Sequence, residues 1–322
     1  MKIRLAKVYL FLILFACGCG YDNDTSEFLN GRMLFLGDSI THNGAYVSFI
    51  EHELRKTFPE RDFDIIAIGL SSETASGLTE PDHAYRRPCV HDRIDSALAK
   101  IKPDVVSVCY GMNDGIYHPQ SNDRFAAYKN GIVEIIEKIK ARGARVILIT
   151  PPPFDPHPIP HKVGDDQAEH YGYANPYYRY DLVLADYSAW LMTLHQPRLL
   201  KVDVNTAMTG YLAKERATNA AFCLSPDGVH PDSVGHLLMS RTFLGALGIP
   251  DDTTDVRLAA AQIQRTDLYQ LIDQRRTVLG DAWRAEIGHT HRHQWEGLPV
   301  AEAERKALEL RNRIHQLAVP AN

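Results

Sequence analysis

The stretch Met33-Leu34-Phe35-Leu36-Gly37-Asp38-Ser39-Ile40 decides the fold, because an apolar run leads directly into a short turn that carries a serine. A short apolar run of this kind is typical of a buried β-strand. A serine just after the carboxyl end of such a strand lies where α/β sheets hold their active sites, on a turn that can expose its Oγ. We therefore take Ser39 as the first candidate catalytic residue.

Apolar runs of strand length recur along the chain, and stretches with helical periodicity separate them. The expected strands are residues 33–36, 64–70, 104–110, 145–150 and 199–204. The expected helices are residues 48–58, 91–101, 124–141, 178–195 and 233–247. This alternation predicts an α/β fold, a flavodoxin-like three-layer α/β/α domain with a central parallel sheet over residues 28–250.

Two further motifs supply an amide donor, an acid and a base. Gly111-Met112-Asn113-Asp114 follows the expected strand 104–110, and Asp227-Gly228-Val229-His230 places an acid and a histidine three residues apart. The carboxyl ends of parallel strands meet at one edge of a sheet. We therefore expect the loop with Asp227 and His230 to fold back toward Ser39 and Asn113 at that edge.

This set of motifs resembles the GDSL hydrolases, also called the SGNH hydrolase superfamily of serine esterases and acylhydrolases. The resemblance covers residues 28–250 and rests on spaced motifs. It implies that Ser39 is the nucleophile, that Asn113 donates to the oxyanion hole, and that Asp227 and His230 are the acid and the base. The resemblance implies no cofactor. The backbone N–H of Ser39 would also belong to the oxyanion hole.

One family position departs from the pattern. The family motif places an oxyanion-hole glycine where the stretch Ala67-Ile68-Gly69-Leu70-Ser71-Ser72-Glu73-Thr74 has Ser72. Any residue except proline offers a backbone N–H, so Ser72 can replace glycine unless the position demands a positive φ. Gly69 is the alternative donor if the loop register differs by three residues. Glu73 and Thr74 are expected to support the loop.

Metal chemistry is the competing interpretation. Two groups of histidines are close in sequence, one alternating and one in a Pro-rich loop: His289, His291 and His293, and His157, His161 and His170. No carboxylate cluster or cysteine set completes either group in the sequence, since Cys89, Cys109 and Cys223 are scattered. We expect solvated loop histidines and no metal.

Overall charge argues against a nucleic-acid partner. The chain of 322 residues carries a formal net charge of −5 and has a sequence pI near 6.3. A protein with this balance and no Lys/Arg-rich block has no basic field to attract phosphate.

The N-terminus has the layout of an export signal. Lys2, Arg4 and Lys7 precede the nine apolar residues 8–16, which are too few to span a bilayer as a helix. Residues 14–17 resemble a bacterial lipobox, which would make Cys17 the acylated residue, with Cys19 as a second candidate. We expect a signal over residues 1–19, a tether over 20–27, and an exported, membrane-anchored lipoprotein, periplasmic or at the cell surface. A plain cleaved signal is the alternative.

After residue 250 the pattern changes to a helical C-terminal extension, residues 251–322. Helices are expected over 255–277 and 300–318, the second with an apolar face that packs on the domain or, alternatively, forms a dimer seam. The oligomeric state stays open. The intervening segment 281–297 is rich in aromatic residues and histidines, and we expect it to pack near the rim of the active site.

The expected function is that of a serine esterase acting on short acyl groups, O-acetyl groups on a polysaccharide or a small acylated molecule. Aromatic side chains near the expected cleft are candidates to stack on sugars: Tyr171, Tyr173, Tyr177, Tyr178, Trp283 and Trp295. Two alternatives remain, a lipid acylhydrolase of the lysophospholipase or thioesterase type and a non-catalytic glycan-binding protein on the same fold.

Overall fold

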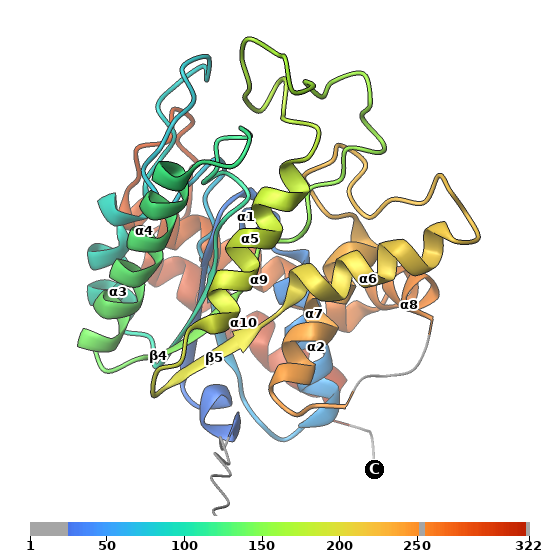
Figure 1. Cartoon of the computed structure of the whole chain (residues 1–322). Helices are drawn as coiled ribbons and strands as arrows, with labels where there is room; N and C mark the ends of the chain where they lie inside the picture. Colours follow the sequence, from blue (N-terminus) through green and yellow to red (C-terminus); the bar gives the residue numbers. More distant parts are fainter. Residues whose placement is uncertain (1–24, 251–254, 320–322) are drawn as a thin grey trace, which may run out of the picture.

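The computed structural model describes residues 25–250 and 255–319, drawn in colour in Figure 1. A five-stranded sheet, parallel throughout, lies at the centre with strand order β2-β1-β3-β4-β5. Its strands are β1 (Arg32–Gly37), β2 (Asp64–Ala67), β3 (Val105–Cys109), β4 (Arg145–Ile149) and β5 (Leu199–Val202). This order is that of flavodoxin-like folds, so the structure confirms the predicted fold class.

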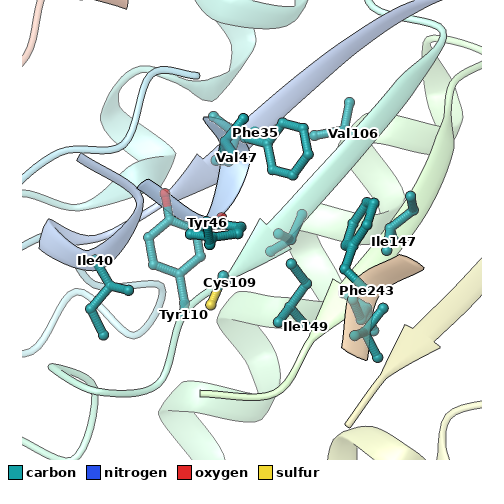
Figure 2. Packing of buried hydrophobic residues seen from close by; sticks show 14 of the residues in the cluster. Phe35, Ile40, Tyr46, Val47, Val106, Cys109, Tyr110, Ile147, Ile149 and Phe243 are labelled. Atoms are coloured by element: carbon teal, nitrogen blue, oxygen red, sulfur yellow. The ribbon is translucent and has the colours of Figure 1, made fainter. Parts of the chain in front are cut away.

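The middle residues of the strands are largely apolar, as expected for a parallel sheet that helices cover on both faces. Leu34, Phe35 and Leu36 of β1 are all fully buried. Phe35 packs against Tyr46 and Phe243, with ring centroids 5.9 and 5.6 Å apart, and Figure 2 shows this cluster beside Val106 of β3. The stretch that leads to Ser39 is therefore anchored in the middle of the core.

Helices lie on the two sides of the sheet (Figure 1). On one side α2 packs against α7, and on the other lie α3 and α4. The helices are α1 (Ser39–Asn43), α2 (Ala45–Thr57), α3 (Ile94–Ile101), α4 (Asn122–Ala141), α5 (Tyr180–Thr193), α6 (Val204–Arg216), α7 (Ser233–Ala246), α8 (Val256–Gln264), α9 (Asp267–Ile287) and α10 (Val300–Ala318). Short 3-10 turns, Thr25–Leu29 and Val90–Asp92, complete the set.

Several element boundaries differ from the sequence expectation; the expected strand 64–70, for example, ends at Ala67. A capping residue explains two of the differences. The expected strand to residue 204 ends at Val202, because Asp203 caps α6 by accepting the N–H of Thr206 at 3.1 Å. The expected helix 255–277 is two helices, because Thr266 caps α9 by accepting the N–H of Tyr269 at 3.2 Å.

The C-terminal helices share the core of the sheet domain. Arg275 of α9 donates to Glu51 of α2 at 3.2 Å and to the Ile65 carbonyl of β2 at 3.3 Å. Helix α9 continues to Ile287, so Trp283 is a buried core residue, and the expectation that it stacks on a sugar is wrong. The buried face of α10 packs on α9 within the chain, which fits the packed-helix interpretation.

The predicted signal, Cys17, Cys19 and the tether up to residue 24 lie outside the described residues. Within residues 25–250 and 255–319, no helix combines the length and the apolar character needed to cross a membrane.

Candidate active site

Ser39, His230 and Asp227 form one hydrogen-bonded chain at the carboxyl edge of the sheet. The Oγ of Ser39 lies 2.8 Å from Nε2 of His230, and Nδ1 of His230 lies 2.6 Å from Oδ2 of Asp227. The serine and the histidine are separated by 191 positions in sequence. This is the geometry in which an imidazole can take a proton from a hydroxyl while a carboxylate stabilises the charged ring.

Local backbone structure fixes each member of this chain. Ser39 is the first residue of α1, directly after β1, and Asp38 caps that helix by accepting the N–H of Ile40 at 3.0 Å. Oδ1 of Asp227 accepts the backbone N–H groups of Val229 and His230, at 3.0 and 2.7 Å. One short turn therefore holds the carboxylate and the imidazole in mutual contact.

The charges in this turn favour a proton on the imidazole. Burial disfavours the charged form of Asp227, but hydrogen bonds from the His230 ring and from two backbone N–H groups outweigh it and lower the pKa of Asp227 to about 2. Burial also disfavours the charged form of His230, but the hydrogen bond and the negative charge of Asp227 outweigh it and raise the pKa of His230. Asp227 is therefore ionised at neutral pH and poised to stabilise an imidazolium.

Asn113 lies beside this chain with its amide held on three sides. Its Nδ2 donates to the Glu73 carbonyl at 3.1 Å, and its Oδ1 accepts from Tyr117 and Arg87 at 3.0 and 3.1 Å. The side chain is only 3% exposed. Because an amide nitrogen carries two hydrogens, one N–H of Asn113 remains to donate to a ligand.

Ser72 lines the cavity that Ser39, Asn113 and His230 also line, and its backbone is in the left-handed region with φ of 62°. The position therefore does demand a positive φ. A serine is strained in this region, whereas a glycine is not. Gly69 lies elsewhere: its carbonyl accepts from His42 and Arg284, and a Cβ there would meet the backbone of Thr41 and His42 at 2.3 and 2.2 Å. The structure places Ser72, and not Gly69, among the residues that line the cavity.

Two buried ion pairs support the loop that carries Ser72. Glu73 accepts two hydrogen bonds from Arg93, both at 2.6 Å, and a third from Tyr110 at 2.6 Å, so it supports the loop as expected. Arg87 pairs with Glu80 through bonds of 2.6 and 2.7 Å. This second pair could not be predicted from the sequence, because nothing in the local sequence around residues 80–87 indicates burial of charges.

Burial is the largest influence on the pKa of two other groups near Ser39. It raises the pKa of Asp38 to about 7, since the carboxyl is removed from water. It also lowers the pKa of His42 to about 4, with the positive charge of Arg284 acting in the same direction. His42 bonds to the Gly69 carbonyl at 3.1 Å and makes no contact with Ser39 Oγ, so it is not placed as a base.

A cavity of about 340 Å³ opens over these groups. Its lining combines polar and aromatic side chains: Ser39, Ser71, Ser72, His83, Tyr85, Arg87, Asn113, Tyr117, Tyr173 and His230. A second cavity of about 310 Å³ shares three lining residues with the first, His83, Tyr85 and Tyr173. We call these the serine cavity and the outer cavity.

The outer cavity lies between two loops. Its lining is Glu80, Asp82, His83, Ala84, Tyr85, His170, Tyr171, Gly172, Tyr173, Ala174 and Asn175. Tyr171 and Tyr173 are the two expected sugar-stacking residues that line it. Tyr177 and Tyr178 instead donate to Asp166, at 2.8 and 3.0 Å.

The alternating histidines of the C-terminal segment surround an indole ring. Trp295 lies 4.7 Å, between ring centroids, from His42, from His291 and from His293, and 5.5 Å from His289. Across residues 25–250 and 255–319, no group of three or more His, Cys, Asp or Glu side chains is arranged to hold a metal ion.

A parallel flavodoxin-like sheet with a Ser–His–Asp chain at its carboxyl edge is an arrangement found in ester hydrolases. Residues 35–238 match the GDSL-like Lipase/Acylhydrolase family. The chain therefore belongs to this family and is a GDSL-type ester hydrolase. A search of curated proteins gave no match.

Two solved structures align with this chain at low sequence identity. A catalytic mutant of Axe2, an acetylxylan esterase from Geobacillus stearothermophilus, aligns with a TM-score of 0.51 and 22% identity over 69% of this chain and 95% of that one. A gut microbial diltiazem-metabolizing enzyme aligns with a TM-score of 0.49 and 20% identity over 68% of this chain. The match spans only 47% of that enzyme. At 22% identity the likeness to Axe2 extends to the fold alone.

Proposed function

We propose that the protein is a serine esterase that removes short acyl groups, O-acetyl groups foremost, from a carbohydrate through an acyl-enzyme on Ser39. The observation that carries the proposal is the continuous chain from Ser39 Oγ through His230 to Asp227, open to the serine cavity. Within the family this chain supplies the nucleophile, the base and the acid.

The reaction would run in two halves. His230 Nε2 takes the proton of Ser39 as Oγ forms a bond to the acyl carbon, and the same proton then passes to the leaving alcohol as its C–O bond breaks. A water molecule next attacks the acyl-enzyme, giving its proton to His230, and the carboxylic acid leaves as the proton returns to Ser39. Asp227 stays ionised throughout and stabilises the imidazolium.

The oxyanion in each half would meet three donors. These are the backbone N–H of Ser39 in the first turn of α1, the backbone N–H of Ser72, and the free N–H of Asn113. Among the described residues, no protein acceptor takes a hydrogen bond from the N–H of Ser72. That N–H is therefore available to a ligand in the serine cavity.

The lining of the serine cavity favours a short acyl group. Around Ser39 the walls carry hydroxyl, amide and guanidinium groups, in Ser71, Asn113 and Arg87. A long hydrocarbon chain gains free energy only by burial against apolar surface, about 25 cal/mol per Å². These polar walls offer little of that gain, whereas an acetyl group needs almost none.

The outer cavity has the character of a sugar site. Tyrosine rings supply flat faces on which a pyranose ring can stack, and Asp82, His170 and Asn175 supply hydrogen-bonding groups. Among the described residues that line it, no aliphatic side chain is larger than alanine. Because this cavity adjoins the serine cavity, it would take the alcohol part of the ester. Axe2, which shares the fold, is an acetylxylan esterase.

An acyl-chain series tests the chemistry first. Rates with p-nitrophenyl esters from acetate to palmitate should peak at the shortest chains and be lost in Ser39→Ala. A long-chain optimum would instead indicate a lipid acylhydrolase. Equal rates for the wild type and Ser39→Ala would refute the nucleophile.

The carbohydrate proposal has its own test. Tyr171→Ala should raise KM for an acetylated oligosaccharide while leaving KM for p-nitrophenyl acetate unchanged. Tyr178→Ala is the matched control, since this tyrosine lies in the same loop but bonds to Asp166 outside the cavity lining. Equal effects of both variants on the oligosaccharide would refute the sugar site.

Export and lipid anchoring remain proposals that rest on the sequence of residues 1–27. Metabolic palmitate labelling of the wild type, with Cys17→Ala as the control, tests the anchor. Labelling is expected in the wild type only. An unlabelled wild-type protein would refute the lipid anchor.

A further inference from the structure

The backbone of Ser72 is held from outside its own loop. Its hydroxyl lies 3.0 Å from the hydroxyl of Tyr85, and its carbonyl accepts from Arg87 at 3.4 Å. Both contacts come from one segment, residues 85–87, which runs along the serine cavity. A serine at φ of 62° needs such contacts, because an L-residue in the left-handed region otherwise relaxes toward negative φ.

The contact continues into the C-terminal segment between α9 and α10. The Tyr85 hydroxyl lies 2.8 Å from Nε2 of His291, and the two rings meet edge to face with centroids 4.9 Å apart. The His291 side is fixed in turn, because its Nδ1 lies 3.0 Å from the N–H and 3.2 Å from the carbonyl of His293. His291 is 7% exposed although its segment is otherwise at the surface.

The hydroxyls of Ser72 and Tyr85 and the imidazole of His291 can form these hydrogen bonds with either tautomer of His291. If Nε2 of His291 carries a proton, it donates to Tyr85, which then donates to Ser72. If Nδ1 carries the proton, it donates to the His293 carbonyl, and the hydroxyls of Ser72 and Tyr85 donate in the reverse order. The chain therefore fixes positions and has no need to move a proton.

Trp295 ties the same segment to the nucleophile's helix. Its ring packs on His291 and also on His42, which lies in α1 three residues after Ser39. The C-terminal segment thus contacts both sides of the proposed oxyanion hole, the helix that carries Ser39 and, through Tyr85, the loop that carries Ser72.

We propose that the C-terminal segment positions the oxyanion hole, with His291 and Tyr85 as positioning residues that hold the strained Ser72 so that its N–H faces the tetrahedral oxygen. The inference rests on the proposed function. It assigns a role in catalysis to a part of the chain that lies beyond the residues matched by the family, 35–238. A donor that meets only the tetrahedral state changes kcat and leaves KM unchanged.

Tyr85→Phe is the first variant, because it removes one hydroxyl and keeps the ring contacts to His291 and Arg292. With p-nitrophenyl acetate we expect kcat to fall roughly 10-fold or more, short of the 100- to 1000-fold loss typical of deleting a donor. KM and the apparent pKa of His230 in the rate profile should not change. The inhibition constant of an arylboronic acid, whose tetrahedral adduct on Ser39 occupies the hole, should rise by the same factor.

Ser72→Gly supplies the decisive background. Glycine adopts positive φ without strain, so this variant needs no support from Tyr85. Adding Tyr85→Phe to the Ser72→Gly protein should therefore change its kcat by less than about 2-fold, whatever the kcat of Ser72→Gly itself. Ser72→Ala, which keeps the strain and loses the contact, should resemble Tyr85→Phe.

His291→Ala and His293→Ala form a matched pair in the segment itself. The imidazole of His293 is exposed and does not touch Tyr85, so His293→Ala should leave kcat unchanged while His291→Ala lowers it. Thermal melting of each variant separates a loss of folding from a loss of positioning.

Two results would overturn the proposal: an unchanged kcat in Tyr85→Phe, or a Tyr85→Phe loss that is equally large in the Ser72→Gly background. The second result would mean that Tyr85 acts on the substrate directly. Activity that survives Ser39→Ala would instead refute the proposed function, so the two failures are distinguishable.

Discussion

Replacing Asn113 by alanine should separate the chemical role of this residue from its structural one. The side chain would donate one N–H to the oxyanion, and losing one such donor typically costs about 2.7–4 kcal/mol of barrier, or roughly 100- to 1000-fold in kcat. Its other three hydrogen bonds are to Glu73, Tyr117 and Arg87. A buried partner left unsatisfied costs about 1–3 kcal/mol, and Arg87 keeps its pair with Glu80.

The loss of folding free energy should therefore be about 2–6 kcal/mol, from the carbonyl of Glu73 and the hydroxyl of Tyr117 together. Initial rates with p-nitrophenyl acetate give kcat, and urea unfolding followed by tryptophan fluorescence gives the stability. An Asn113→Ala protein that is destabilised but keeps the wild-type kcat would refute the place of Asn113 in the oxyanion hole. Tyr117→Phe is the control, because it removes a hydrogen bond to the same amide and no proposed donor.

Three other predictions follow from the charges in the structure. The rate kcat/KM should rise with pH as His230 loses its proton, with a midpoint above the ordinary histidine value of 6.5 because its pKa is raised; Asp227→Asn should move that midpoint to lower pH, and an unmoved midpoint would exclude Asp227 as the cause. Arg87→Met should cost about 3–5 kcal/mol of unfolding free energy, because it leaves the buried carboxylate of Glu80 unpaired; adding Glu80→Gln should recover part of the loss in urea titrations, and no recovery would contradict the assignment. Burial, with the positive charge of Arg276 acting in the same direction, lowers the pKa of His236 to about 3. Between pH 6.5 and about 3 the unfolded state therefore binds a proton that the folded state does not, so the free energy of unfolding falls as the pH falls through that window. His236→Gln should flatten this pH dependence, and an unchanged slope would contradict the prediction.

The sequence predicted the architecture because the strands are short, continuous apolar runs. Such runs, alternating with helical stretches, favour a parallel sheet wherever they occur. Two of the boundaries that differ were set by single capping residues: Asp203 caps α6, and Thr266 separates α8 from α9. Either residue also fits a turn, so local sequence alone could not decide between the two.

In the candidate site, the residues in short motifs could be predicted from the sequence, and the residues that support them through long-range contacts could not. Ser39, Asn113, Asp227 and His230 lie in compact motifs directly after strands or in one short turn, so their sequence positions indicated that they would meet. Residues that support the site through long-range contacts left no such signal. His291, for example, reaches Tyr85 across 206 positions, and a histidine in a polar segment reads as solvated until the fold is known.

The conformation of Ser72 was beyond the reach of sequence for a different reason. A serine is compatible with negative and positive φ, and the choice depends on contacts made by Tyr85 and Arg87. From the sequence it follows only that a serine at this position would be strained if φ were positive. Only the structure shows that this condition holds, with φ of 62°.

The central claim is that Ser39 carries the acyl group during turnover. The most direct measurement is mass spectrometry of the enzyme quenched in acid during steady-state hydrolysis of p-nitrophenyl acetate, followed by peptide mapping. The account predicts a mass increase of one acetyl group on the peptide that contains Ser39, absent in Ser39→Ala. An acetyl group on another residue, or full hydrolytic activity in Ser39→Ala, would contradict it.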